Sequence, residues 1–112
     1  MARRDIKGAV DFAYLENYAG GDAGVVEEVL VLFREQAGMW TRLLEHPEGR
    51  RDAAHTLKGA SRGIGANRLG DACEAAESGG PVAPVLDALD AVLADIAAYL
   101  HEEALRSLKT PR

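Results

Sequence analysis

The stretch PVAPVLDALDAVLADIAAYLH, residues 81–101, has the clearest periodicity in the chain. Its large apolar residues recur every three or four positions, as residues on one face of an α-helix do. They are Val85, Leu86, Leu89, Val92, Leu93, Ile96, Tyr99 and Leu100. The spacing predicts one long amphipathic helix, from about Pro81 to beyond His101, with one face in a core.

The composition favours helices in the rest of the chain as well. The 112 residues include 20 alanines and 13 leucines, against 14 valines, isoleucines and threonines together, and aromatic residues make up 5%. Alanine and leucine favour helices, whereas β-branched and aromatic residues favour strands. The length suits one domain with a modest core. We therefore expect an all-α fold in a single domain over residues 1–112, with its core at about 12–107.

Stop signals divide the chain before residue 81 into four more helices. A short one containing Phe12 ends at the glycine pair 20–21, and Asp22 is placed to cap the second. The second ends at "EHPEG", residues 45–49. The third begins either with Pro47 in its first turn or with Asp52 as its cap.

The segment "GIGA", residues 63–66, is expected to break or bend the third helix, and another helix covers "NRLGDACEAAE", residues 67–77, before "SGGP". Such short connections are typical of an antiparallel up-and-down four-helix bundle. The short extra N-terminal helix would lie across one end of it. We expect the termini "MARRD" and "KTPR" to be frayed.

The charge is unevenly distributed. A net charge of −5 argues against a general binder of nucleic acid or of an acidic membrane surface. Residues 50–68, however, have a net charge of +4, which leaves −9 for the rest. The basic residues there are Arg50, Arg51, Lys58, Arg62 and Arg68, against Asp52 alone.

Other features exclude further classes of protein. The single cysteine, Cys73, cannot form an internal disulfide, and we expect it and Trp40 to be buried. No apolar run is long enough for a signal peptide or a membrane span, so a cytoplasmic location is expected. No metal site is expected, because His46, His55 and His101 lack paired ligands three or four residues away.

His55 lies inside the basic segment, and a helical wheel at about 100° per residue gives its orientation. Within about 60° of it lie Arg51, Lys58, Gly59 and Arg62. The opposite, core-facing pole holds Ala53, Leu57, Ala60 and Ile64. His55 is therefore expected to face solvent among cations.

This setting suits a covalently bound anion. Neighbouring cations would stabilise a dianion on the imidazole of His55 by attraction and charge-assisted hydrogen bonds. An exposed glycine within a helix lowers stability by about 1 kcal/mol relative to alanine, so helix stability does not explain a glycine at position 59. It leaves bare backbone for a partner to approach, although close helix packing is an alternative. Arg51 and Arg62 could contact that partner or simply form a solvated face.

The segment "AHTLKGASRGIGA", residues 54–66, resembles the signature of histidine-containing phosphotransfer domains, the four-helix modules of multistep phosphorelays. In that signature a histidine is followed by an apolar residue, lysine, glycine and a later glycine. The segments "GGD", "LFREQ" and "ANRLGDACEAAE" are also similar to the family pattern, so the resemblance covers most of residues 12–100.

The resemblance implies roles for individual residues. His55 would be the phosphoacceptor, Lys58 would hold the phosphoryl oxygens, Gly59 would admit the partner and Gly65 would serve the next turn. Glu77 departs from the family, in which many members have glutamine. A carboxylate there could hydrogen-bond the other ring nitrogen but would repel a nearby phosphate, so its role stays open.

The chain lacks a nucleotide-binding loop and an acidic cluster for Mg²⁺, so we expect a phosphocarrier without autokinase activity or cofactor of its own. The resemblance implies that the donor is the phosphoaspartate of a receiver domain, which supplies the Mg²⁺. The phosphoryl group would then pass to another receiver. A hybrid histidine kinase is a further partner, and a monomer is expected.

Two alternatives remain open at this point. One is the dimerising histidine domain of a sensor kinase, in which an acidic residue usually follows the histidine, where this chain has Thr56. The other is a helical protein–protein interaction module that carries no phosphoryl group.

Overall fold

The computed structural model describes residues 9–109, and these form five α-helices and no strand. The helices are α1 (Phe12–Tyr18), α2 (Ala23–Glu45), α3 (Pro47–Gly63), α4 (Asn67–Glu77) and α5 (Ala83–Lys109). The predicted all-α class is confirmed. The expectation for "MARRD" lies outside the described residues, as does that for "KTPR" except at Lys109, which is the last residue of α5.

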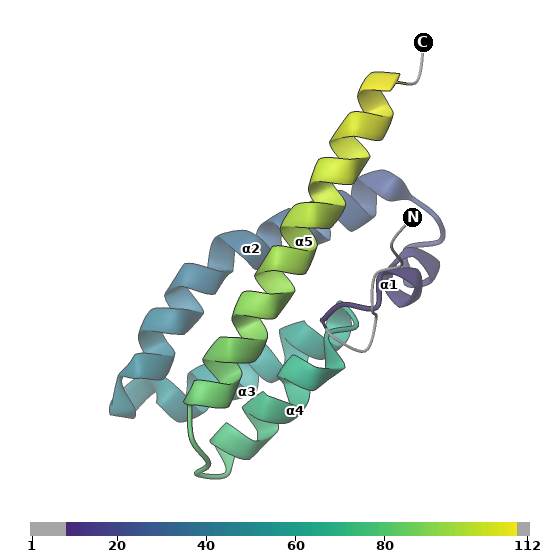
Figure 1. Cartoon of the computed structure of the whole chain (residues 1–112). Coiled ribbons are helices and arrows are strands. Elements are labelled where there is room, and N and C mark those ends of the chain that lie inside the picture. Colours follow the sequence, from purple (N-terminus) through teal and green to yellow (C-terminus); the bar gives the residue numbers. More distant parts are fainter. Residues whose placement is uncertain (1–8, 110–112) are drawn as a thin grey trace.

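The four long helices form the predicted bundle. Helix α2 packs against α3 and α5, and α4 packs against α3 and α5, so the four helices enclose one core. Consecutive helices run in opposite directions, and α1 lies near the connection between α3 and α4 (Figure 1). This arrangement places α3 and α4 side by side along most of the length of α4.

The helix starts follow local hydrogen bonding. The Asp22 carboxylate accepts hydrogen bonds from the backbone N–H groups of Gly24 and Val25, at 3.0 and 3.2 Å, which confirms it as the cap of α2. Helix α3 begins at Pro47, so the first of the two predicted starts is right and Asp52 lies inside the helix. Pro47 has no N–H to leave unpaired in the first turn.

The core is apolar and built from one face of every helix. Trp40 and Cys73 are buried, as predicted, and along the stripe of α5 Val85, Leu89, Val92, Ile96 and Tyr99 are buried while Leu86 and Leu93 are partly buried. Ser61 is the buried polar residue among the described ones, and its hydroxyl donates to the Leu57 carbonyl at 2.6 Å. That bond satisfies the hydroxyl locally, so Ser61 needs no other polar partner.

Helix α1 is held at the turn between α3 and α4. The Asp11 N–H donates to the Gly65 carbonyl at 3.0 Å. Gly65 has a φ of +82°, and a Cβ there would lie 2.9 Å from the Asp11 carbonyl oxygen. Phe12 stacks on Tyr99 with ring centroids 4.3 Å apart. A glycine is therefore required at this turn for both conformation and space.

Helix α5 projects past the rest of the bundle. It begins at Ala83, slightly later than predicted, and continues beyond His101 as expected. Its last turns extend beyond the other helices (Figure 1), and Leu105 and Leu108 on them are exposed. Within residues 9–109, no helix is both long and apolar enough to cross a membrane.

Candidate functional site

His55 projects from the middle of α3 into solvent. Its side chain is 67% exposed, which confirms the orientation derived from the helical wheel. Ala53, Leu57 and Ile64, on the opposite side of the wheel, are buried. The burial of these apolar residues against α2 and α4 turns the imidazole outward.

Glu77, the last residue of α4, contacts both functional candidates on α3. Its Oε2 lies 2.7 Å from His55 Nδ1, and its Oε1 lies 2.8 Å from Lys58 Nζ. These contacts lower the pKa of the Glu77 carboxyl, mainly through the Lys58 ammonium and next through the His55 ring. Glu77 is therefore an ionised carboxylate that bridges the histidine and the lysine.

The bridge decides which nitrogen of His55 is available for chemistry. A carboxylate only accepts hydrogen bonds, so Nδ1 must carry the proton that the ring donates to Glu77. In a neutral imidazole the lone pair is then on Nε2. Glu77 therefore orients His55 with Nε2 as its nucleophilic atom.

The backbone beside His55 is open. A Cβ built on Gly59 would meet none of the described atoms within 4 Å, and Gly59 is exposed. The alternative explanation, close packing of another helix against Gly59, is therefore wrong. A partner surface could approach the imidazole along this side of α3.

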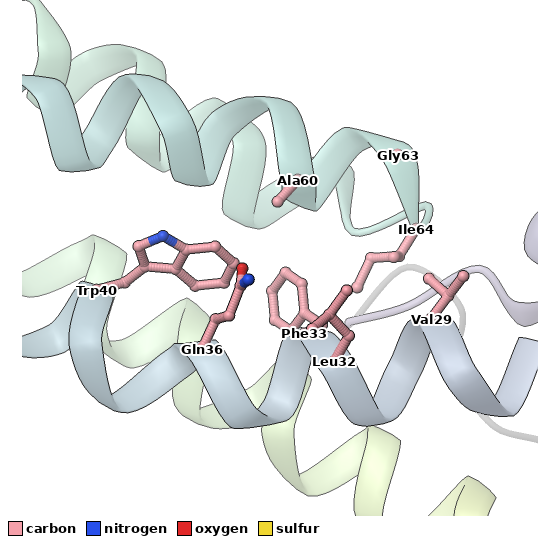
Figure 2. A pocket seen from close by; sticks show the side chains of 8 residues that line it. All are labelled: Val29, Leu32, Phe33, Gln36, Trp40, Ala60, Gly63 and Ile64. Atoms are coloured by element: carbon pink, nitrogen blue, oxygen red, sulfur yellow. The ribbon is translucent and has the colours of Figure 1, made fainter.

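An apolar hollow of about 220 Å³ lies between α2 and α3. Figure 2 shows side chains from the two helices facing each other across it. Its lining residues are Val29, Leu32, Phe33, Gln36, Trp40, Ala60, Gly63 and Ile64. Leu32 is 54% exposed. The hollow gives α3 an apolar surface beyond Gly59, and it is lined in part by Trp40, Ala60 and Ile64, which the sequence assigned to the core.

Arg62 reaches across to α4 and away from His55. Its Nη2 lies 3.0 Å from Asp71 Oδ1 and 2.8 Å from Glu74 Oε1, and its stem covers Gly70. The two carboxylates raise the pKa of the guanidinium, Glu74 more than Asp71. The charge of Arg62 is thus paired between α3 and α4.

Arg51 lies on the N-terminal side of His55 and is exposed. It lines a second hollow between the start of α3 and the end of α4, together with Arg50 and Glu77. Arg50 is held there by donating from Nε to the Leu44 carbonyl at 2.9 Å. Because α3 begins at Pro47, Arg51 is helical and shares the side of α3 that the wheel gave it.

The site therefore brings together His55, Lys58 and Gly59, adds Glu77, and leaves Arg62 in a separate ion-pair cluster. Among the residues that the structure describes, no three His, Cys, Asp or Glu side chains are grouped so that they could hold a metal ion. Glu77 stood out in the sequence as an acid where related domains often have glutamine, able either to hydrogen-bond the other ring nitrogen of His55 or to repel a phosphate. The structure shows the hydrogen bond.

A four-helix bundle that exposes a histidine beside a lysine and a bare glycine is the arrangement of a histidine phosphotransfer domain. The family model of the Hpt domain matches residues 26–106, so the chain belongs to the Hpt domain family. The chain is also similar to a solved structure, the histidine phosphotransferase ShpA from Caulobacter crescentus. The two share 60% sequence identity with a TM-score of 0.85, and the match covers 91% of this chain and 100% of that chain. Comparison with curated protein sequences gave no match.

These findings settle the general role of the protein. It is a phosphocarrier of a phosphorelay, and its partners belong to the receiver domains and kinases of such relays. The expected resemblance to phosphotransfer domains is confirmed.

Proposed function

We propose that His55 is the phosphoacceptor, which takes a phosphoryl group from the phosphoaspartate of one receiver domain and passes it to another. The observation that supports this most is the exposed imidazole whose Nδ1 is hydrogen-bonded to Glu77 at 2.7 Å. Glu77 holds the ring through Nδ1, and Nε2 faces solvent.

The transfer is a displacement at phosphorus. The Nε2 lone pair of His55 attacks, an N–P bond forms, and the P–O bond to the aspartyl oxygen breaks with its electron pair left on the carboxylate. No proton has to be removed from Nε2 before the attack. The same steps in reverse pass the phosphoryl group on.

Lys58 stabilises the phosphoryl oxygens in this proposal. In the unphosphorylated protein its ammonium is paired with Glu77 Oε1 at 2.8 Å. A phosphoryl group on His55, one turn away on α3, offers a dianion in place of a monoanion. Lys58 therefore moves from Glu77 to the phosphoryl oxygens when His55 is phosphorylated.

The receiver docks where the surface is bare and apolar. Gly59 allows close approach to the imidazole, and the hollow between α2 and α3 contributes apolar area. Arg51 is an exposed cation at the other side of His55, where it can meet acidic residues of the receiver. Arg62 contributes at the edge of the contact, where its guanidinium is also ion-paired with Asp71 and Glu74 of α4.

The carrier works without an ATP site, a metal or a cofactor of its own, and the receiver supplies the Mg²⁺ in this proposal. It acts as a cytoplasmic monomer, and the receiver of a hybrid histidine kinase is one source of its phosphoryl group.

Labelled phosphate transfer tests the assignment. A receiver domain phosphorylated on aspartate is mixed with the protein and with His55→Gln. We expect base-stable, acid-labile label on the wild type and none on the variant, with helicity unchanged by circular dichroism. His46→Gln and His101→Gln are the matched controls, because both histidines are also exposed. Label that persists on His55→Gln would show that another residue is the acceptor.

A further inference from the structure

Glu77 contacts both His55 and Lys58, and its contact with His55 bears on the charge of the ring once a phosphoryl group is attached. The carboxylate occupies the position where related domains often have a neutral glutamine, and it contacts the Nδ1 of His55 directly. A glutamine carbonyl can accept the same hydrogen bond, but it brings no charge. The difference between the two residues is therefore largest when the ring itself becomes charged.

We propose that Glu77 keeps the Nδ1 proton on His55 while a phosphoryl group is bound to Nε2, and so holds the phosphohistidine in its protonated, readily transferred form. This inference rests on the proposed role of His55 as phosphoacceptor.

The proton on Nδ1 stays on the ring when the phosphoryl group is added. Before transfer the ring is neutral, with its proton on Nδ1. Attack through Nε2 adds the phosphoryl group and leaves the ring as a phosphoimidazolium, with the proton still on Nδ1. A carboxylate within 2.7 Å of Nδ1 favours that positive ring. Ion pairing of this kind stabilises the imidazolium in other histidine-based sites.

Onward transfer depends on the same proton. When the N–P bond of a phosphoimidazolium breaks, its electron pair returns to Nε2 and a neutral imidazole leaves. If Nδ1 has lost its proton, the leaving group is an imidazolate anion, which is far more basic and departs more slowly. Retention of the proton thus keeps the phosphoryl group transferable as the pH rises.

The other charges around His55 do not replace Glu77. On α3, Lys58 is the near cation, and it moves toward the phosphoryl oxygens. Arg51 is exposed and Arg62 is paired with Asp71 and Glu74. On α4, Glu77 is the carboxylate within hydrogen-bond distance of the ring. Asp52, one turn before His55 on α3, is exposed and makes no hydrogen bond with the ring, so Glu77 is the described acid that offsets the charge on Nδ1 directly.

The rate of transfer from phosphorylated protein to an unphosphorylated receiver, measured between pH 6 and 9, tests the proposal. Wild type, Glu77→Gln and Glu74→Gln are compared with the same receiver, so that the titration of the receiver cancels in the ratios. Without the carboxylate, Nδ1 should lose its proton at a lower pH, so we expect transfer from Glu77→Gln to begin to fall at a lower pH than transfer from wild type and to be at least about tenfold slower at pH 8.5. Glu74→Gln removes an acid one turn away that contacts Arg62 and not His55, so its rate should depend on pH as the wild type's does, whatever the release of Arg62 does to the absolute rate.

A second measurement needs no variant. Nitrogen-15 NMR of the phosphorylated wild type, labelled at histidine, should show Nδ1 of His55 still protonated at pH 8. Parallel pH profiles for wild type and Glu77→Gln, or an unprotonated Nδ1 at pH 8, would overturn the role of Glu77. Absence of any phosphate on His55 would instead overturn the proposed function itself.

Discussion

Lys58 has two successive anionic partners in the proposed cycle, first the Glu77 carboxylate and then the phosphoryl group. Its side chain is 23% exposed, so the ammonium is partly shielded from water in its pair with Glu77. Partial shielding strengthens a charge–charge interaction relative to an exposed pair. Exchange of partners at Lys58 thus replaces one ion pair with another, while Glu77 keeps its contact with His55.

Lys58→Ala should slow phosphotransfer by roughly 10- to 100-fold, because the phosphoryl oxygens lose their cation in the transition state. Rapid-quench measurement of label arriving on the protein gives the rate constant. Arg68→Ala is a suitable control, since it removes an exposed cation of α4 that lies in the hollow against α5 and not beside His55. A rate equal to that of wild type would show that Lys58 does not take part in phosphotransfer.

The lowered pKa of Glu77 predicts how the site responds to acid. The ordinary value is 4.5 and the folded value is below it, so the interaction stabilises the fold above pH 4.5 and is lost as the pH falls through the folded value. Carbon-13 NMR of the Glu77 carboxyl should give a midpoint below 4.5. Lys58→Ala should move this midpoint upward, because Lys58 is the larger cause of the shift. A midpoint of 4.5 or higher in the wild type would contradict the bridged geometry.

Gly59→Gln should stabilise the isolated protein by about 0.5–1 kcal/mol and yet block phosphotransfer. The Cβ of the added side chain would meet none of the described atoms within 4 Å, but the side chain would occupy the space through which the receiver approaches His55. Urea unfolding and the transfer assay measure the two effects. Gly38→Gln, in the middle of α2, should give a similar gain in stability without loss of transfer. Destabilisation by Gly59→Gln would mean that the glycine serves packing.

At the scale of helices, the turn between α3 and α4 is a junction for three elements. Gly65 turns the chain into α4 while its carbonyl accepts from Asp11, so the same residue positions α1. The register of α4 against α3 follows from this turn, and it is the register that brings Glu77 to His55. A change at Gly65 therefore acts on the site although it lies at the far end of α3.

Gly65→Ala should destabilise the fold by about 2–3 kcal/mol, because the positive φ is unfavourable for alanine and the Cβ would press on the Asp11 carbonyl. Gly79→Ala separates the two causes. Gly79 also has a positive φ, +103°, but a Cβ there meets no described atom within 4 Å. Its loss of stability in urea should be about 1–2 kcal/mol. Equal losses at both positions would show that the Asp11 contact contributes nothing.

The helices could be predicted from the sequence more fully than their mutual contacts. Periodicity and stop signals gave five helices, and the wheel gave the outward orientation of His55. The start of α3 stayed ambiguous because Pro47 and Asp52 both suit a first turn. The contact between His55 and Glu77 joins residues 22 positions apart, so it depends on how α4 packs against α3, and periodicity along one helix does not contain that information. The same limit hid the pairing of Arg62 with Asp71 and Glu74.

At the scale of the whole molecule, the bundle has a long axis of 51 Å against 23 and 22 Å across, and α5 accounts for much of that length. Tyr99 is the last residue of α5 within the buried core, where it stacks on Phe12 and donates to Glu16 at 2.7 Å. The turns beyond it are mostly exposed. The bundle is therefore complete before α5 ends.

A chain that ends after Ala104 should unfold in urea within about 0.5 kcal/mol of the full chain and should transfer phosphate at the same rate, because residues 105–108, the part of the removed segment whose side chains the structure describes, are exposed. A chain that ends after Ala98 should lose about 3 kcal/mol or more, since it lacks Tyr99 and its contacts with α1. Equal stability of the two shortened chains would contradict the role of Tyr99 in holding α1.

The burial of Cys73 makes the molecule convenient for site-specific labelling. Burial raises the pKa of this thiol to about 11, so at neutral pH it is neither accessible nor ionised, and thiol reagents act on the thiolate. A cysteine introduced at Leu108, which is 82% exposed, would react with a maleimide dye while the native thiol stays unmodified. Since 27 helical residues span about 40 Å, a fluorophore there would sit far from Glu77 and could report receiver binding without touching the phosphorylation site.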